Sequence, residues 1–196
     1  MDVIYGSSEG QLFDLNGQRK YLTRSEARML LAAARKADQQ TRLFCRLLYY
    51  TGCRISEALQ ITPRRLDIET GRVIFRSLKR RRTIYRGVPV PRRFLSELIA
   101  YARSSELEPD ARLFPWCRQT GWRRIRALMA AAGIDGPQAT PKGLRHQYGV
   151  LAIDRKVPEG TLQRWMGHAR RRNTHVYTYA VGTEERALAD RMWRAQ

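Results

Sequence analysis

The period of the apolar residues changes twice along this chain, and that change limits the folds open to it. Between residues 22 and 61 the apolar residues recur at helical spacing, whereas residues 72–90 hold two short β-rich runs around a basic turn. From residue 92 onward the helical spacing returns. A period of 3.6 suits a helix and a period of 2 suits a strand, so neither segment can adopt the other's structure. The pattern predicts an α+β, mainly helical domain with a small antiparallel sheet inserted among the helices.

Capping and stop signals place the expected elements. Thr23 and Glu26 have the spacing of a capping box, which begins a helix. Gly52 suits the left-handed residue that follows a helix, and Pro63 stops the next, shorter one. We expect strands at 72–78 and 83–90, in a hairpin or a three-stranded sheet, and helices at 21–36, 39–52, 54–61, 92–104, 119–132, 142–155, 158–166, 172–179 and 183–194.

The chain reads as one domain preceded by an arm. Residues 1–20 are polar and rich in glycine, with little periodicity, and we expect a loose N-terminal arm there. Residues 21–196 contain no internal repeat and no low-complexity linker. With 196 residues, 43% of them hydrophobic, the chain is long enough to bury one real core.

The net charge indicates a polyanionic partner. There are 37 lysines and arginines against 18 acidic residues, which gives a formal charge of +19 and a sequence pI near 10.9. Such an excess favours nucleic acid, and arginine, which dominates it, suits bidentate phosphate contacts. The alternative, a basic protein without such a partner, does not explain why the arginines are spread over several elements.

Several features favour a cytoplasmic protein. The three cysteines, Cys45, Cys53 and Cys117, are odd in number and form no CxxC pair, which fits a reducing compartment, with the thiols as small core residues. The first ten residues lack the basic and apolar regions of a signal peptide. No apolar run approaches the length of a membrane span, so no membrane partner is expected.

Two segments place arginine where it could hold an anion. "TGCRISEAL", residues 51–59, has Arg54 at a helix start and Glu57 one turn later. "PKGLRHQYG", residues 141–149, brings Lys142, Arg145 and His146 close together on a helix. These cations would repel one another unless an anion lies nearby or they point to water.

Two further segments supply other reactive groups. Lys79 is the only lysine of the expected sheet region and adjoins the basic turn. "WMGHARRRNTHVYTYA", residues 165–180, holds His168 and, nine residues later, Tyr177. Tyr179 competes with Tyr177 as the reactive hydroxyl of this segment, although the nine-residue spacing favours Tyr177.

Taken in order, these segments resemble the boxes of the tyrosine recombinases, also called the phage integrase family, over roughly residues 21–194. The resemblance implies the catalytic domain of a site-specific DNA recombinase that cleaves and rejoins DNA through a 3′-phosphotyrosine, with no metal, ATP or other cofactor. Tyr177 would be the nucleophile, Arg54 and Arg145 would clamp the phosphate, and His168 would donate a further hydrogen bond. Lys79 would protonate the leaving 5′-oxygen, and Lys142 would assist at the phosphate.

The chain also departs from the family's usual pattern. Lys142 stands where the family usually has histidine, and lysine is a poorer neutral base because its ordinary pKa is about 10.4. Only about twenty residues precede the catalytic domain, so no separate N-terminal core-binding domain is expected. In length and in its "LTRSE" opening the chain resembles the short invertases that switch fimbrial genes.

The resemblance also implies partners. Double-stranded DNA is the expected substrate, bound as a homotetramer on paired sites by a protein that is monomeric when free, with accessory DNA-bending proteins as further candidates. The segment 183–194, with Leu188, Met192 and Trp193 on one stripe, would dock on a neighbouring protomer or on its own core. The residues expected to contact DNA are Arg80, Arg81, Arg82, His146, Arg170, Arg171 and Arg172, with His146 alternatively serving the structure.

Two other functions remain open at this point. Residues 53–66 also read as a helix-turn-helix, which would suit a non-catalytic, sequence-specific DNA-binding regulator. A type IB topoisomerase uses related chemistry to relax DNA without site preference. A regulator gives no reason for Arg54, Lys79, Arg145, His168 and Tyr177 to occur together in this order.

Overall fold

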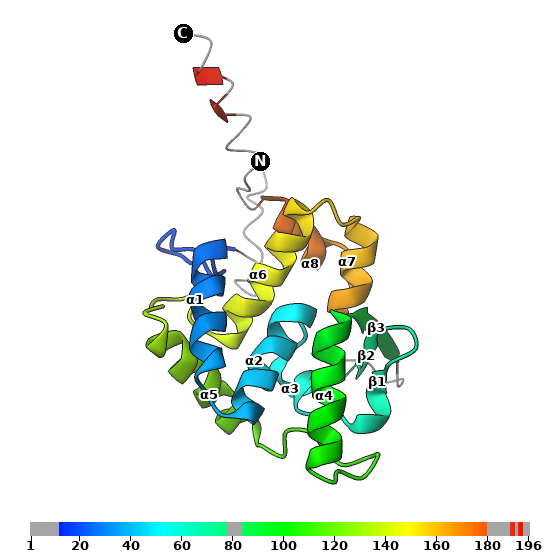
Figure 1. The fold of residues 1–196 in the computed structure, drawn as a ribbon. Coiled ribbons are helices and arrows are strands. Elements are labelled where there is room, and N and C mark those ends of the chain that lie inside the picture. Colours follow the sequence, from blue (N-terminus) through cyan, green and yellow to red (C-terminus); the bar gives the residue numbers. More distant parts are fainter. Residues whose placement is uncertain (1–11, 78–83, 180–188, 191, 194–196) are drawn as a thin grey trace.

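A computed structural model describes residues 12–77, 84–179, 189–190 and 192–193, and it confirms the mainly helical fold with a small sheet (Figure 1). Five of the predicted helices, 39–52, 92–104, 119–132, 142–155 and 158–166, begin and end within one residue of the observed ones. The helices are α1 (Arg24–Arg35), α2 (Gln39–Thr51), α3 (Ile55–Ala58), α4 (Arg92–Ser104), α5 (Arg118–Ala131), α6 (Pro141–Asp154), α7 (Glu159–Met166) and α8 (Arg172–His175), with the 3-10 turns η1 (Pro63–Arg65) and η2 (Val176–Tyr179).

The helix ends follow the predicted signals. Thr23 and Glu26 form a reciprocal capping box at the start of α1. Gly52 takes a left-handed conformation, with φ +56°, after the last residue of α2. A side chain at that position would also collide with Tyr148 of α6, at 2.4 Å, so glycine is required twice over. The chain can therefore turn sharply from α2 into α3 while α6 packs against the turn.

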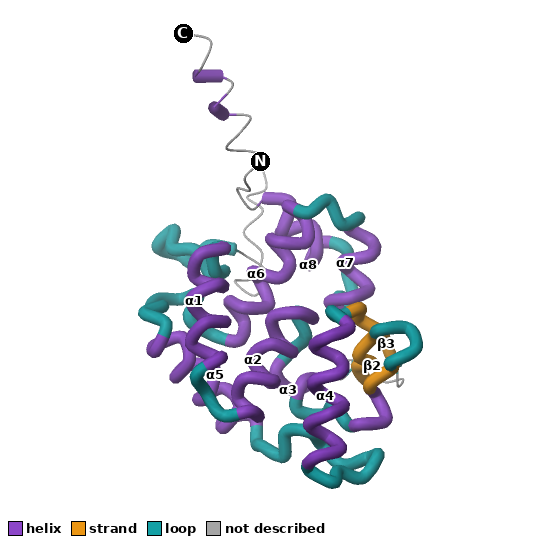
Figure 2. The backbone as a smooth tube through the Cα atoms, viewed as in Figure 1, coloured by secondary structure: helices purple, strands orange, loops and turns teal. Residues whose placement is uncertain are grey.

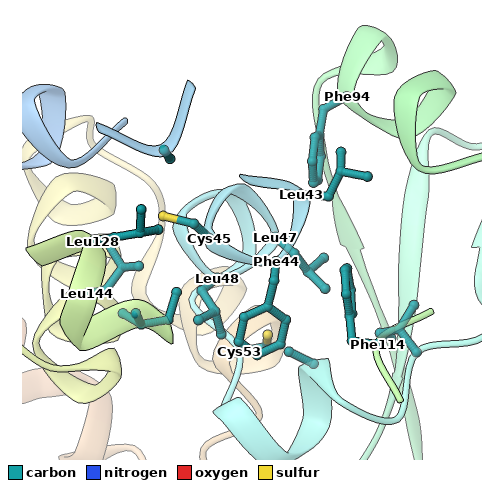
Figure 3. Close-up of a cluster of buried hydrophobic side chains, with 14 of the residues drawn as sticks. Leu43, Phe44, Cys45, Leu47, Leu48, Cys53, Phe94, Phe114, Leu128 and Leu144 are labelled. Carbon is teal, nitrogen blue, oxygen red and sulfur yellow. The ribbon is translucent and has the colours of Figure 1, made fainter. Parts of the chain in front are cut away.

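Helix α2 lies at the centre of the core (Figure 3). Its apolar residues project to two sides: toward Leu128 of α5 and Leu144 of α6, and toward Phe94 of α4 and Phe114. Phe44 of α2 packs edge-on against Phe114, with ring centroids 5.1 Å apart. Because α2 is apolar on so much of its circumference, it holds the N-terminal and C-terminal helices in one core.

The three strands form one antiparallel sheet in the order β1 (Leu66–Asp67), β2 (Arg72–Arg76) and β3 (Tyr85–Pro89). The sheet lies at the edge of the helical body, beside α4 and α7 (Figure 2). The register pairs Val73 with Val88 and Phe75 with Arg86. Val73, Phe75 and Val88 are fully buried, so this face of the sheet is the inner one. Arg86 is therefore an arginine on an inward-facing position.

The described part of the N-terminal segment differs from the loose arm expected there. Residues 12–20 turn back on themselves, with Phe13 bridged to Arg19 and Gly17 at φ +74°. Leu12 is buried in a second apolar cluster with residues of α6 and α7, and Arg19 makes two hydrogen bonds to Glu26. Apolar contacts of Leu12 and Phe13 and the ion pair of Arg19 thus hold this segment in place, although its sequence has no helical or strand period.

The placement of the cysteines agrees with the sequence only in part. Cys45 and Cys53 are buried, as expected, but Cys117 is exposed because it is the N-cap of α5, where its sulfur accepts a hydrogen bond from the backbone N–H of Thr120. The expected helix at 183–194 lies largely outside the described residues. Within the described parts of the chain, every helix is too short or too polar to span a bilayer.

Candidate active site

Arg54 and Glu57 form the first part of the site, at the start of α3. The Glu57 carboxylate accepts hydrogen bonds from the Arg54 backbone N–H at 2.8 Å and from its Nη1 at 3.0 Å. The Glu57 side chain is 0% exposed, whereas that of Arg54 remains 27% exposed. The pair is therefore more than a surface ion pair: a buried carboxylate orients the guanidinium of an arginine that stays partly exposed.

Arg86 completes this cluster from β3. Its Nη1 and Nη2 donate to the two carboxylate oxygens of Glu57 at 3.1 and 2.7 Å, a bidentate arrangement. Burial alone would raise the pKa of Glu57, but the hydrogen bonds and charges of Arg86 and Arg54 hold that pKa below its ordinary value. Glu57 is thus an anion shared by two guanidinium groups.

Arg145 joins two helix ends that lie far apart in sequence. From α6, its Nη1 donates to the carbonyl of Gly52 at 2.6 Å and its Nη2 to the carbonyl of Met166 at 2.8 Å. Burial, and then the charge of Arg54, lowers the pKa of Arg145 to about 10. The two guanidinium groups therefore repel each other, and an anion between them would relieve that repulsion.

Tyr177 lies in a slot on α6. It is 2% exposed, and its Oη is 3.2 Å from Nδ1 of His146. Gly149, one turn after His146, lets the ring approach closely: a Cβ there would come within 2.5 Å of it. Burial raises the pKa of Tyr177 to about 12, against the opposing charges of Arg145 and Arg54.

His168 covers the other side of that ring. The imidazole stacks on Tyr177 with centroids 6.2 Å apart and planes 17° apart. Its Nδ1 is 2.9 Å from the hydroxyl of Thr174, which is fully buried. Burial, followed by the charges of Arg145 and Arg54, lowers the pKa of His168 to about 3, so the ring is neutral at pH 7.

The turn after α7 carries His168 and is held by hydrogen bonds to the last four carbonyls of that helix. A helix leaves its last four carbonyls without helical partners. Here the backbone N–H groups of Gly167 and His168 bond to the carbonyls of Arg164 and Gln163, with Gly167 left-handed at φ +65°. Arg86 Nε donates to the carbonyl of Trp165 at 2.8 Å, and Arg145 donates to that of Met166. The turn that carries His168 is therefore held by two arginines.

Lys142 lies on the first turn of α6 and is exposed. Burial, and then the charge of Lys142, lowers the pKa of Lys20, so these two lysines are close enough to repel each other. The next residue, Gly143, must be glycine, because a Cβ there would come within 1.9 Å of the Gln138 carbonyl oxygen. The N-terminus of α6 is thus pressed against the loop before it, and Lys142 points outward.

Several expected DNA contacts have a different placement or none. Arg170, Arg171 and Arg172 are exposed around the start of α8. His146 is 5% exposed and faces Tyr177, which differs from its expected place on the DNA backbone, because α6 turns this face inward. Lys79, Arg80, Arg81 and Arg82 lie outside the described residues.

Sequence reasoning missed Arg86, Gly149 and Thr174. The signal for Arg86 was present: it alternates with the buried Val88 and Val90, so it occupies an inward-facing strand position. Gly149 lies one turn beyond His146 and would have been noticed only with the tyrosine placed above it. Nothing in the local sequence distinguishes Thr174 from a solvent-exposed helix residue.

Comparisons with known proteins bear on this arrangement. The chain matches the model of the phage integrase family over residues 20–182. It is 28% identical to tyrosine recombinase XerA of Thermococcus kodakarensis, over 81% of this chain and 57% of that protein. It is 30% identical to tyrosine recombinase XerD of Haemophilus ducreyi, over 72% of this chain and 50% of that protein.

Solved structures share the fold. The crystal structure of XerH site-specific recombinase bound to palindromic difH substrate superposes with a TM-score of 0.74 at 21% identity, over 89% of this chain and 53% of that one. The chain spans about half to three fifths of the length of these relatives. The family match covers most of the chain, including every described element of the site, and the chain belongs to the phage integrase family.

Proposed function

We propose that this chain is the catalytic domain of a site-specific DNA recombinase, which cleaves and rejoins DNA through a covalent 3′-phosphotyrosine. One observation carries the proposal: Arg145 binds the carbonyl of Gly52, two residues before Arg54, and that of Met166, two residues before His168, which stacks on Tyr177. Two cations and a tyrosine assembled in this way suit a phosphodiester. The names of the relatives, tyrosine recombinases XerA and XerD, support it.

The proposed reaction exchanges one phosphoester for another. Oη of Tyr177 attacks the phosphorus, its proton passes to the neutral ring of His146, and the phosphorus–O5′ bond breaks. The leaving 5′-oxygen takes a proton, for which Lys79 is the proposed donor. Arg54, Arg145 and His168 stabilise the charge on the non-bridging oxygens. The phosphotyrosine preserves the bond energy, so rejoining is the reverse reaction with a second 5′-hydroxyl and needs no metal or ATP.

Access of the phosphate to Tyr177 requires a change in the slot. The tyrosine is 2% exposed, so the entrance must widen before a phosphate can reach Oη. On the side away from α6, the slot is closed by the short η2 turn that carries Tyr177 itself. We propose that bound DNA opens this boundary and leaves His146 and Gly149 of α6 as the fixed wall behind the ring.

Further features of the proposed function rest on the sequence. DNA contacts at Arg80, Arg81, Arg82, Arg170, Arg171 and Arg172 would hold the duplex, with Lys142 at the scissile phosphate. Four protomers would meet on two sites, since recombination breaks four strands, and inversion of a DNA segment would be the outcome, with DNA-bending proteins assisting. A DNA substrate and three free cysteines suit the cytoplasm.

Covalent capture tests the function. Nicked duplexes with randomised flanks are incubated with the protein, and adducts that survive denaturation are recovered and sequenced. We expect adducts enriched in one DNA site for the wild type and for Tyr179→Phe, and none for Tyr177→Phe. An adduct formed by Tyr177→Phe would contradict the assignment of the nucleophile.

The same assay separates the alternatives. A DNA-binding regulator would enrich a site without ever forming an adduct. A type IB topoisomerase would form adducts with no preferred flank and would relax supercoiled plasmid. The slot for Tyr177 beside two arginines favours a DNA-cleaving enzyme over a regulator, and the names of the relatives favour a recombinase over a topoisomerase.

A further inference from the structure

Arg86 is the one described arginine that connects the sheet to both halves of the site. Its side chain is only 10% exposed. It makes a bidentate ion pair with Glu57 of α3, donates from Nε to the Trp165 carbonyl of α7, and lies 5.1 Å from the centroid of the Phe75 ring beside it in the sheet. Nε, Nη1 and Nη2 each donate a hydrogen bond, so the planar guanidinium is held in one orientation and joins the sheet to α3 and α7.

The first consequence concerns the charge of Arg54. Glu57 is wholly buried and must be paired with a cation. If Arg54 were its only partner, the carboxylate would cancel the charge that Arg54 presents to a phosphate. Because Arg86 binds both carboxylate oxygens, the three groups together keep one positive charge, and Arg54 remains 27% exposed on the open side.

The second consequence concerns the position of His168. The Trp165 carbonyl is one of the four at the end of α7, and Arg86 is its partner. Gly167 leaves room for that contact, since a Cβ there would lie 3.0 Å from the Arg86 guanidinium. A guanidinium at a helix C-terminus is also favoured electrostatically. The same side chain thus fixes the turn from which His168 stacks on Tyr177.

We propose that Arg86 is a positioning residue for DNA cleavage, which sets the charge of Arg54 through Glu57 and the location of His168 through Trp165. It touches no reacting atom, and DNA is not its ligand. This inference rests on the proposed function, since it assigns Arg86 a part in that reaction. It also makes a claim about the pairing of Glu57 that holds whether or not the chain cleaves DNA.

The test compares Arg86→Lys with Arg86→Met and with a control on the same sheet. Lysine keeps the charge but cannot bind two carboxylate oxygens and a carbonyl in one plane. For Arg86→Lys we expect adduct formation on bound nicked duplex to slow by ~10-fold or more, the scale of losing a group that orients a reacting side chain. The dissociation constant for DNA should stay within about 3-fold, because the net charge is unchanged.

The control is Arg72→Met, which removes one charge from the exposed face of the neighbouring strand β2. It should weaken DNA binding at least as much as Arg86→Met while leaving adduct formation on bound DNA unchanged. If Arg86→Lys cleaved bound DNA as fast as the wild type, or if Arg86→Met changed affinity alone, Arg86 would be an ordinary DNA contact and the inference would be wrong.

Thermal unfolding of the double variant tests the link to Glu57 without reference to activity. Arg86→Met leaves a buried carboxylate with one cation, whereas Glu57→Gln removes the carboxylate. We expect Glu57→Gln to restore much of the melting temperature that Arg86→Met loses, so the two changes should not add. Additive losses would refute the pairing. A wild type that forms no adduct would refute the proposed function, and this measurement would still decide the pairing.

Discussion

At the scale of single residues, the site depends on buried groups held in one protonation state. His146 and His168 are both neutral at pH 7, because burial lowers the pKa of each to about 3. Around His146 the charges of Lys142, Arg145 and Lys20 act in the same direction. Burial keeps the His146 ring neutral, but a pKa near 3 also makes it a weak base, so in the proposed chemistry it accepts the Tyr177 proton only after DNA has opened the slot and water reaches the ring.

These two histidines should make the protein sensitive to acid. In the unfolded chain a histidine binds a proton below about pH 6.5, whereas in the folded protein it does so only near pH 3. The stability that they contribute is therefore complete above pH 6.5 and is lost as pH falls through that window. We expect a loss of about 2 kcal/mol per histidine between pH 7 and pH 5, measured by urea unfolding.

A matched pair of variants isolates this effect. His146→Gln should reduce the slope of the free energy of unfolding against pH between pH 5 and 6.5, because one proton fewer is taken up on unfolding. His168→Gln should reduce that dependence by a similar amount, because burial lowers the pKa of that ring as well. Equal slopes for His146→Gln and the wild type would contradict a buried neutral histidine at that position.

The two proposed clamp arginines should differ in what their removal does. Arg54→Ala should slow adduct formation ~100-fold, the scale of losing one oxyanion donor, with little loss of stability because Arg86 still pairs with Glu57. Arg145→Ala should slow it as much and also destabilise the fold by about 1–3 kcal/mol for each carbonyl left without a partner. Urea unfolding beside the capture assay measures both, and equal stability of the two variants would contradict this division.

At the scale of elements, α6 does two tasks with one helical face. Its Arg145 ties the ends of α2 and α7 together, while His146 and Gly149, one turn apart, form the wall on which Tyr177 lies. Glycine inside a helix ordinarily costs about 0.5–1 kcal/mol relative to alanine. Gly149 is tolerated in α6 because any side chain there would displace the tyrosine.

Alanine at this glycine should therefore destabilise, against the usual trend. In Gly149→Ala the new Cβ would lie 2.5 Å from the ring of Tyr177, and relieving that overlap should cost about 1–3 kcal/mol. The ring should also become more exposed, so spectrophotometric titration should show one more tyrosine ionising near pH 10. Gly160→Ala in α7 is the matched control: nothing lies within 4 Å of its position, and it should stabilise slightly. A gain in stability from Gly149→Ala would show that the slot is not packed as described.

At the scale of the whole molecule, the chain carries a formal charge of +19. In the described part of the protein, Glu57 and its arginines form the most enclosed ion pairs, and many other arginines are exposed. The like charges on such a surface repel one another, and binding a polyanion relieves that repulsion. The proposed DNA would therefore stabilise the protein as well as serve as its substrate.

DNA binding should accordingly depend steeply on salt. The logarithm of the binding constant should fall with the logarithm of the salt concentration at about −0.9 per phosphate neutralised on duplex DNA. Fluorescence anisotropy with a labelled duplex from 50 to about 300 mM salt would measure the slope, and several phosphates should be involved. A slope near zero would indicate that the positive charge serves a purpose other than binding DNA.

The sequence by itself determined the elements and the order of the reactive groups. The capping box at Thr23, the left-handed Gly52 and the bounds of α4 follow from residues that are neighbours along the chain, because helix formation depends on contacts three and four residues apart. Arg54, Arg145, His168 and Tyr177 lie around one centre, where α6 meets the end of α2, the end of α7 and η2. Local pattern and family resemblance were enough to name Arg54, Arg145, His168 and Tyr177.

Only the tertiary structure decided which groups meet. Arg86 lies 29 residues from Glu57 and 79 from Trp165, and no local period encodes either contact. The sequence pattern also did not predict three other features. These are the burial of Tyr177 against Gly149 and His146, the docking of residues 12–20, and the exposure of Cys117. Periodicity indicates which face of an element is buried. The partner of a buried polar group depends instead on how the elements pack, and here that packing brings Glu57 and the Trp165 carbonyl to Arg86.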